Sequence, residues 1–312
     1  MVYRYLILSS VINFLFADIV QFGGELYMDG QNARNIGMGG YSASFSTGAN
    51  PAQLMHIQES SMHFSHKDKF AGLSSVSTFS YLYPKLIHGI QYPIFISLVN
   101  RSVNDIPDTR SAKDSDGSID YSRIEDISMQ EVGLTFATIY NMNHYTIGFS
   151  IKPFYTGLAE YKAWGISGDF GVMAPFLENR MKLGCKIENI FSLNRWDTGT
   201  IESYVPLFIG GGQIQLKSLL LGIEVGSRLT DDPPLNYHAG FEFHKQNEIV
   251  IIRGGVSHNN LFSAGIGFAL KRLQIDYAYI HPLKTLPFEP SHIMSLAIFL
   301  NKLSDLKGKI TP

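Results

Sequence analysis

Apolar and polar residues alternate with a period of two along most of this 312-residue chain. In residues 145–152, large apolar side chains hold every second position, and Thr, Gly, Ser and Lys hold the positions between them. Successive side chains of a β-strand point to opposite faces, whereas the apolar spacing typical of an amphipathic helix is hard to find here. The chain is therefore predicted to be all-β. The same alternation recurs at 131–136, 219–225, 237–243, 262–268 and 292–300.

The polar face of these strands is unusual because glycine and charged residues recur on it. A soluble β-sandwich turns its polar face to bulk water, where glycine has little reason to recur. A barrel lumen accepts small inward residues, and charges of both signs can pair across it. The pattern therefore favours a transmembrane antiparallel β-barrel, and a soluble secreted β-sandwich binding protein remains the alternative. The predicted inward charges are Glu131, Lys152, Lys186, Glu188, Glu224, Glu242, Arg253 and Asp276.

About 14 strands are predicted, and the connections between them sort by length. If the first strand runs outward, every even-numbered connection is short, whereas the odd-numbered ones include the long segment 100–125. Outer-membrane barrels have short periplasmic turns and longer external loops, so we expect 100–125 to be external. The barrel is expected to span 59–302, followed by a tail at 303–312. The predicted strands are 61–66, 72–82, 87–99, 126–140, 144–155, 165–174, 181–191, 202–214, 218–227, 235–243, 248–257, 261–270, 273–280 and 291–301.

Composition agrees with a barrel but does not prove one. The chain is 45% hydrophobic with a formal net charge of −2, and its mean hydropathy is +0.03. A barrel gives such a value because apolar outward residues are averaged with polar inward ones. Nothing in the charge balance favours a nucleic-acid partner, and the single cysteine excludes a disulfide within the chain.

Residues 1–17 resemble a secretory signal peptide. One basic residue, Arg4, precedes an apolar run from Tyr5 to Phe16 that is too short to cross a bilayer as a helix. We expect cleavage near Ala17, and hence export to the outer membrane of a Gram-negative-type envelope. A buried first strand is the alternative interpretation.

The segment Ala33–Leu54 is dense in glycine and lies between the signal peptide and the first predicted strand. Gly37, Gly39 and Gly40 permit positive φ or close backbone approach, which indicates a compact knot and not a helix. Asn50 and Pro51 predict a second tight feature, because proline fixes its own φ and restricts the residue before it.

This segment resembles the amino-terminal signature of the PorV/PorQ group of FadL-like outer-membrane proteins. Ala33–Gly40 (ARNIGMGG) is similar to its GARALGMGGA pattern, and Ala49–Leu54 (ANPAQL) is similar to WNPAGL. Ala49 and Gln53 depart from that pattern. Further similar stretches are Trp164–Gly171, Arg253–Gly255, Ile275–Tyr279 and Ser291–His292. The resemblance implies a 14-stranded barrel with an N-terminal plug, acting in transport or secretion.

We therefore predict that residues 18–58 form a plug inside the barrel. A lumen wall of glycine and charged residues needs filling, and a glycine-rich segment can approach such a wall closely. Arg34 is the expected charged contact of the plug, with Asp276 or Glu242 as its partner. The predicted structural or gating residues are Arg34, Gly37, Gly39, Gly40, Asn50, Pro51, Glu242, Arg253 and Asp276.

The sequence offers no catalytic motif, so we expect neither an enzyme nor a cofactor, and an outer-membrane barrel enzyme is kept only as an alternative. The ten histidines are scattered without metal-ligand spacing. Residues 113–120 (KDSDGSID) have oxygen-rich spacing like a calcium loop, but the bidentate glutamate is missing. Membrane lipid is the expected partner, together with hydrophobic small molecules or components of a type IX-like secretion system.

Overall fold

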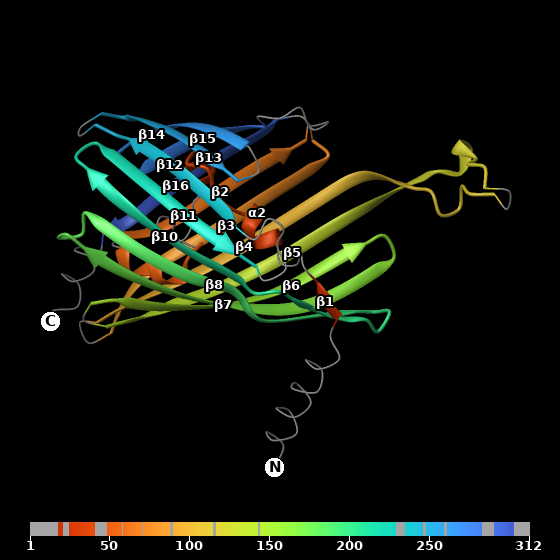
Figure 1. Cartoon of the computed structure of the whole chain (residues 1–312), viewed down its shortest axis with the longest axis horizontal. Helices are drawn as coiled ribbons and strands as arrows, with labels where there is room; N and C mark the ends of the chain where they lie inside the picture. The colour runs from red at the N-terminus through yellow and green to blue at the C-terminus, as the bar shows by residue number, and fades with distance from the viewer. Residues whose placement is uncertain are drawn as a thin grey trace, which may run out of the picture.

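The computed structural model shows a closed antiparallel barrel of fourteen strands (Figure 1). It describes residues 18–20, 25–40, 49–57, 59–70, 72–87, 90–114, 117–142, 144–228, 235–245, 248–258, 261–282 and 290–302. The predicted signal peptide and C-terminal tail lie outside these residues. The barrel strands are β2 (Glu59–Lys69), β3 (Ser74–Ile87), β4 (Ile90–Asp108), β5 (Glu125–Asn141), β6 (Thr146–Leu158), β7 (Tyr161–Phe176), β8 (Met181–Trp196), β10 (Leu207–Leu216), β11 (Leu219–Ser227), β12 (Asn236–Phe243), β13 (Val250–Ser257), β14 (Leu261–Ala269), β15 (Leu273–Pro282) and β16 (Ser291–Lys302).

Each strand pairs with its neighbours in the sequence, and β16 pairs with β2 to close the wall. Consecutive connections therefore lie at opposite ends of the barrel. We call the end that carries the long connection 109–124 the loop end, and the end that carries the short connections at 142–145 and 217–218 the turn end. At the loop end, β4 and β5 run beyond the other strands as a projecting arm (Figure 1).

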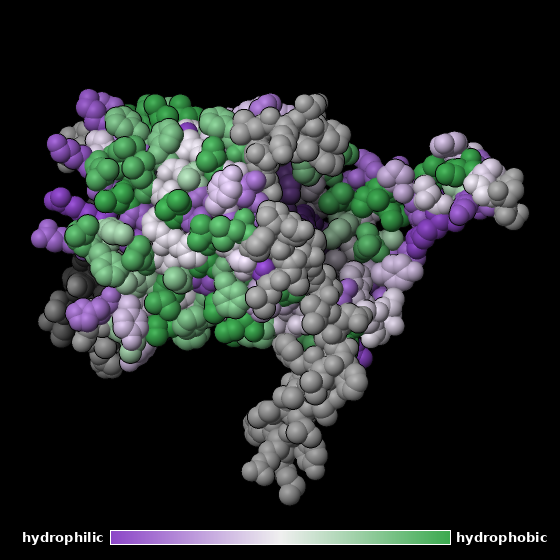
Figure 2. Space-filling model, viewed as in Figure 1, coloured by the Kyte–Doolittle hydropathy of each residue, from purple (hydrophilic) through white to green (hydrophobic). Residues whose placement is uncertain are grey.

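Side-chain exposure follows the predicted alternation. On β6, Phe149 and Ile151 are 52% and 51% exposed, whereas Ser150 and Lys152 are 6% exposed or less. Large apolar residues point outward on the other strands as well, and Figure 2 shows hydrophobic residues over much of one side of the barrel. A soluble sandwich would bury this face, so the prediction of a transmembrane barrel is confirmed over the sandwich alternative.

One predicted strand, 202–214, is divided in two. β9 (Ile201–Tyr204) ends before Pro206, which has no backbone N–H to donate to a ladder, and β10 begins at Leu207. β9 pairs with β8 and, in parallel, with β1 (Asp18–Val20), which precedes the barrel in the sequence.

The described residues of the N-terminal segment between β1 and β2 form three short helices. These are α2 (Glu25–Asp29), α3 (Ala33–Gly37) and the 3₁₀-helix η1 (Pro51–His56). The expectation of a knot without a helix is therefore wrong for 33–37, where the side chain of Asn32 caps one helical turn by accepting from the Asn35 N–H. Among the described residues, no helix is long and apolar enough to cross a membrane.

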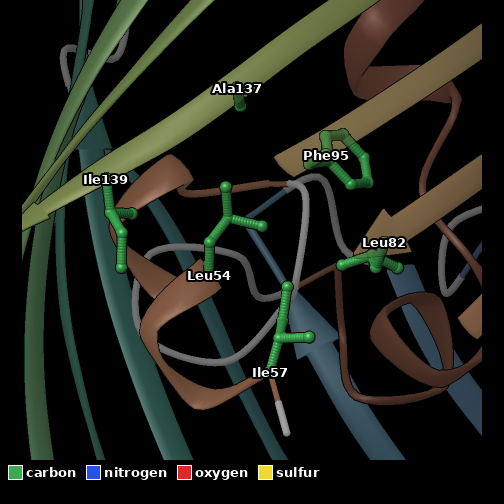
Figure 3. Close-up of a cluster of buried hydrophobic side chains, with 6 residues drawn as sticks. All are labelled: Leu54, Ile57, Leu82, Phe95, Ala137 and Ile139. Carbon is green, nitrogen blue, oxygen red and sulfur yellow. The ribbon is translucent and has the colours of Figure 1, made fainter. Parts of the chain in front are cut away.

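The described residues of this segment lie inside the barrel, with α2 nearest the loop end and η1 nearest the turn end. α2 contacts the loop-end half of β2 and β4, α3 contacts β13–β16, and η1 contacts β4–β7. η1 is held at the turn end by an apolar cluster (Figure 3). Its members are Leu54, Ile57, Leu82, Phe95, Ala137 and Ile139.

Candidate functional site

The interior surfaces around the N-terminal segment form the candidate site, and glycines of the wall lie where the backbone of α3 comes closest. A Cβ on Gly240 or Gly255 would overlap the backbone of Met38 or Gly39. Gly39 has a φ of +86°, and its N–H donates to the Ser263 hydroxyl at 2.9 Å. Inward glycines therefore give the wall room for a second backbone.

Four of the predicted residues form one ionic network. Arg34 donates two hydrogen bonds to Glu242, at 2.7 and 2.8 Å. Arg253, whose side chain is fully buried, donates to Glu242 and to Asp276, each at 2.7 Å. Of the two predicted partners of Arg34, the structure selects Glu242, while Asp276 binds Arg253. A buried arginine between two carboxylates satisfies the rule that buried charges are paired.

Asn50 and Pro51 form the predicted second tight feature. The Asn50 side chain accepts a hydrogen bond from the Ala52 N–H and caps η1, and Pro51 occupies the first helical position. A Cβ on the wall glycines Gly148 or Gly171 would overlap this pair of residues. Gly37 likewise lies against Gly265, whereas Gly40, with a φ of +78°, lies near the His238 ring.

A second ionic cluster was not predicted. Asp29 of α2 receives Lys69 at 2.9 Å, Arg101 at 3.1 Å and Lys67 at 3.4 Å. Burial raises the pKa of Asp29, but the three cations outweigh it and lower the pKa to about 2. The spacing of Lys67 and Lys69 on one strand face was a usable signal, but nothing in the sequence indicated which acid they meet.

Two further ion pairs face the lumen from β6, β7 and β8. Lys152 pairs with Asp169 at 2.7 Å, and Lys186 pairs with Glu188 at 2.6 Å. Lys186 also donates to the Ala49 carbonyl of the N-terminal segment at 3.3 Å. These inward charges therefore pair with opposite charges inside the barrel, within one strand or between neighbouring strands and not across the lumen.

Tyr27 contacts the wall at a gap in the ladder between β5 and β6. The pairing is interrupted at Leu134 and Pro153, because proline has no N–H to donate. The Tyr27 hydroxyl donates to the Pro153 carbonyl at 2.8 Å, and the Leu134 carbonyl is 3.3 Å away. The Tyr27 side chain of the N-terminal segment thus hydrogen-bonds to the wall at the point where the β5–β6 ladder is interrupted.

Two cavities lie on opposite sides of the N-terminal segment. Cavity 1 has a volume of about 250 Å³ and lies against the inner face of β2–β5 and β16. Cavity 2 has a volume of about 540 Å³ and lies against β10–β14, near the loop end. Met28, Gln31, Lys186 and Glu188 line both cavities and therefore lie between them.

The described residues contain no cluster of three or more metal-ligating side chains. In the possible calcium loop, Asp114 and Asp120 both bind Arg123, at 2.6 and 2.8 Å, and Asp116 lies outside the described part of the chain. The carboxylates of Asp114 and Asp120 therefore already pair with Arg123.

Structural comparison finds the same fold in solved outer-membrane transport proteins of low sequence identity. The Pseudomonas putida toluene transporter TodX aligns with a TM-score of 0.67 at 11% identity, covering 88% of this chain and 99% of that one. The Ralstonia pickettii toluene transporter TbuX and the CymD monoaromatic hydrocarbon channel each align with a TM-score of 0.63 at 12% identity and the same coverage. No protein-family model and no curated protein sequence matches the chain. The chain therefore has the FadL-like fold.

Proposed function

We propose that this protein is a non-enzymatic outer-membrane barrel that passes hydrophobic small molecules, and that residues 18–58 act as a plug that controls their passage. The observation that carries the proposal is a closed barrel with an apolar outer face and two adjoining cavities beside an internal segment. A dry cavity of about 150 Å³ is enough to bind benzene, so cavity 1 has room for one substituted ring. The neighbours described as toluene transporters support the same class of cargo.

Membrane location is tested first, by fractionating cells that express the full chain. The protein should stay with the outer membrane after a salt wash and dissolve only in detergent, because its outer face is apolar. Recovery in the salt-washed supernatant would contradict the proposed location.

Transport is then tested by uptake of labelled toluene into whole cells that carry the barrel. Thr135→Trp should block cavity 1 and reduce uptake to the level of cells without the protein, because Thr135 lines that cavity. Thr138→Trp is the matched control, since Thr138 lies three residues further along the same strand and is exposed on the outside. Equal uptake by both variants and the wild type would reject a route through cavity 1.

A role in a type IX-like secretion system is a second candidate, supported by the resemblance to the PorV/PorQ group. The residues that carry this resemblance, Ala33–Gly40 and Ala49–Leu54, form the contacts of α3 and η1 with the wall. Affinity purification from a detergent extract of the native organism tests it. Recovery of secretion components with the full chain supports this role, whereas their absence beside measurable toluene uptake leaves transport as the function.

A further inference from the structure

We infer that cavity 1 selects single-ring compounds that carry a hydrogen-bonding substituent, such as a hydroxyl or amine group, over bare hydrocarbons. This inference rests on the proposed transport function and specifies its cargo. It is based on the chemistry of the cavity wall and not on the neighbouring structures.

The wall of cavity 1 presents apolar and hydroxyl side chains together. Leu82, Phe95 and Val99 supply the apolar surface, each at most 5% exposed. Between them, the inner face of β2–β5 carries the hydroxyls of Ser65, Thr78, Ser80, Ser97 and Thr135. A ligand in this cavity therefore meets hydrogen-bonding groups whichever way its ring lies.

Two of these hydroxyls are available to a ligand. Thr78 donates to the Gly30 carbonyl, and Ser80 and Ser97 bind each other at 2.9 Å. Ser65 and Thr135 are 7% and 8% exposed, and neither side chain makes a hydrogen bond within the described part of the chain. Both line cavity 1. A hydroxyl that faces a cavity loses its hydrogen bond to water when an apolar ligand fills the cavity, whereas a ligand with a polar substituent replaces that bond.

Charged groups at the edge of the cavity strengthen this preference. The pairs Lys152–Asp169 and Lys186–Glu188 both line cavity 1 and are almost fully buried. A bare hydrocarbon displaces water from these groups and returns no hydrogen bond. A site built to bind a hydroxyl rejects the analogue without it more strongly than an apolar pocket rejects an added hydroxyl.

Phenol and toluene form a suitable pair of probes because they differ by one hydroxyl in place of one methyl. We would measure binding of each labelled compound to the full chain in lipid nanodiscs by equilibrium dialysis, with empty nanodiscs correcting for partition into lipid. The wild type should bind phenol at least as tightly as toluene, although phenol is the more soluble in water.

Thr135→Val keeps the shape of the side chain and removes its hydroxyl. It should weaken phenol binding about threefold to tenfold and leave toluene binding unchanged or tighter, as expected for one lost hydrogen bond. Ser65→Ala should act in the same direction. Thr138→Val, on the outer face of the same strand, should change neither.

The outcomes separate this inference from the function on which it rests. The selectivity is overturned if the wild type binds toluene more tightly than phenol and if Thr135→Val and Ser65→Ala leave the ratio of the two dissociation constants unchanged. The proposed transport function would still stand. If neither phenol nor toluene binds to the wild type, both the proposed class of cargo and the inference are rejected.

Discussion

α2 and α3 contact the barrel wall in different ways. α3 and the two residues that follow it, Met38 and Gly39, meet β12–β14 backbone to backbone at wall glycines. α2 meets β2 and β4 through charged side chains around Asp29. The size of the inward residue thus decides how closely the backbone of the N-terminal segment approaches the wall: glycine admits a second backbone, whereas lysine and arginine hold it at the length of a side chain.

The α3 contact should be most sensitive to loss of Arg253. Within the described part of the chain, Arg253 is the only salt-bridge partner of Asp276 and one of two partners of Glu242, and Arg253→Met removes it. Removing one member of a buried ion pair costs about 3–5 kcal/mol, so the free energy of unfolding in detergent should fall by that amount. The control is Lys245→Met, in an exposed pair with Glu248 whose loss should leave the free energy of unfolding nearly unchanged. Equal effects of the two changes would contradict a role of the network in stability.

Gly39→Ala tests the close approach of the two backbones. Its Cβ would lie 2.8 Å from the Val256 carbonyl oxygen, in addition to the strain of a positive φ. Together these costs amount to about 2–4 kcal/mol. The larger change Gly39→Val should loosen the plug further while the strands stay paired.

Gly40→Ala is the matched control for this prediction. Gly40 also has a positive φ, but the nearest atom to its Cβ would be His238 Nδ1 at 3.5 Å. Gly40→Ala should therefore lower the free energy of unfolding only by the strain of the positive φ, about 1–2 kcal/mol. The measurement is small-solute leakage through the purified protein in liposomes, and a Gly39→Val form that leaks no more than wild type would reject the plug.

Lysine at an inward serine tests the hydrogen bond between the wall and the N-terminal segment. Ser263 lines cavity 2 and Ser97 lines cavity 1, so a lysine at either position has a cavity beside it. Ser263→Lys removes the hydroxyl that accepts from the Gly39 N–H, at a cost of about 1 kcal/mol, whereas Ser97 is bonded only to the wall residues Ser80 and Phe79. Protease digestion of the N-terminal segment, followed by mass spectrometry, should show faster cleavage only in Ser263→Lys. Equal cleavage would contradict a role of the Ser263–Gly39 bond in holding the segment.

The anchor of α2 should weaken in acid. The folded-state pKa of Asp29 is about 2, below its ordinary value of 3.8. Its contribution of about 2 kcal/mol is therefore present above about pH 4 and is lost as the pH falls through about 2. Pepsin should cleave the segment faster at pH 2 than at pH 4 in the wild type.

Asp29→Asn should lose that protection at both pH values. Glu25→Gln, at an exposed position of the same helix, should behave as the wild type. Identical digestion of Asp29→Asn and wild type at pH 4 would show that the three cations do not hold α2.

The barrel was predictable because its pattern is local. Alternation and turn length gave the strand number, the two faces and the opposite ends of successive connections, and these follow from the geometry of single strands and turns. The charged residues of the interior were also predictable, because a charged side chain at an inward position such as Glu242 needs an oppositely charged partner inside the lumen.

The interior contacts were less predictable because they join distant segments. The sequence left Arg34 with two possible partners, and only the fold brings Glu242 within reach. Asp29 was missed because it lies in a stretch with no strand pattern. Pro206 lies between β9 and β10, whereas the sequence analysis predicts one strand over 202–214.

The pairing of β2 with β16 has a consequence for the order of assembly. The wall is sealed only when the first and last barrel strands meet, and the N-terminal segment is joined directly to the first of them. A segment that enters after sealing would have to thread lengthwise through a narrow tube. We therefore expect the segment to enter while the sheet is still open and the β2–β16 pairing to form last, around it.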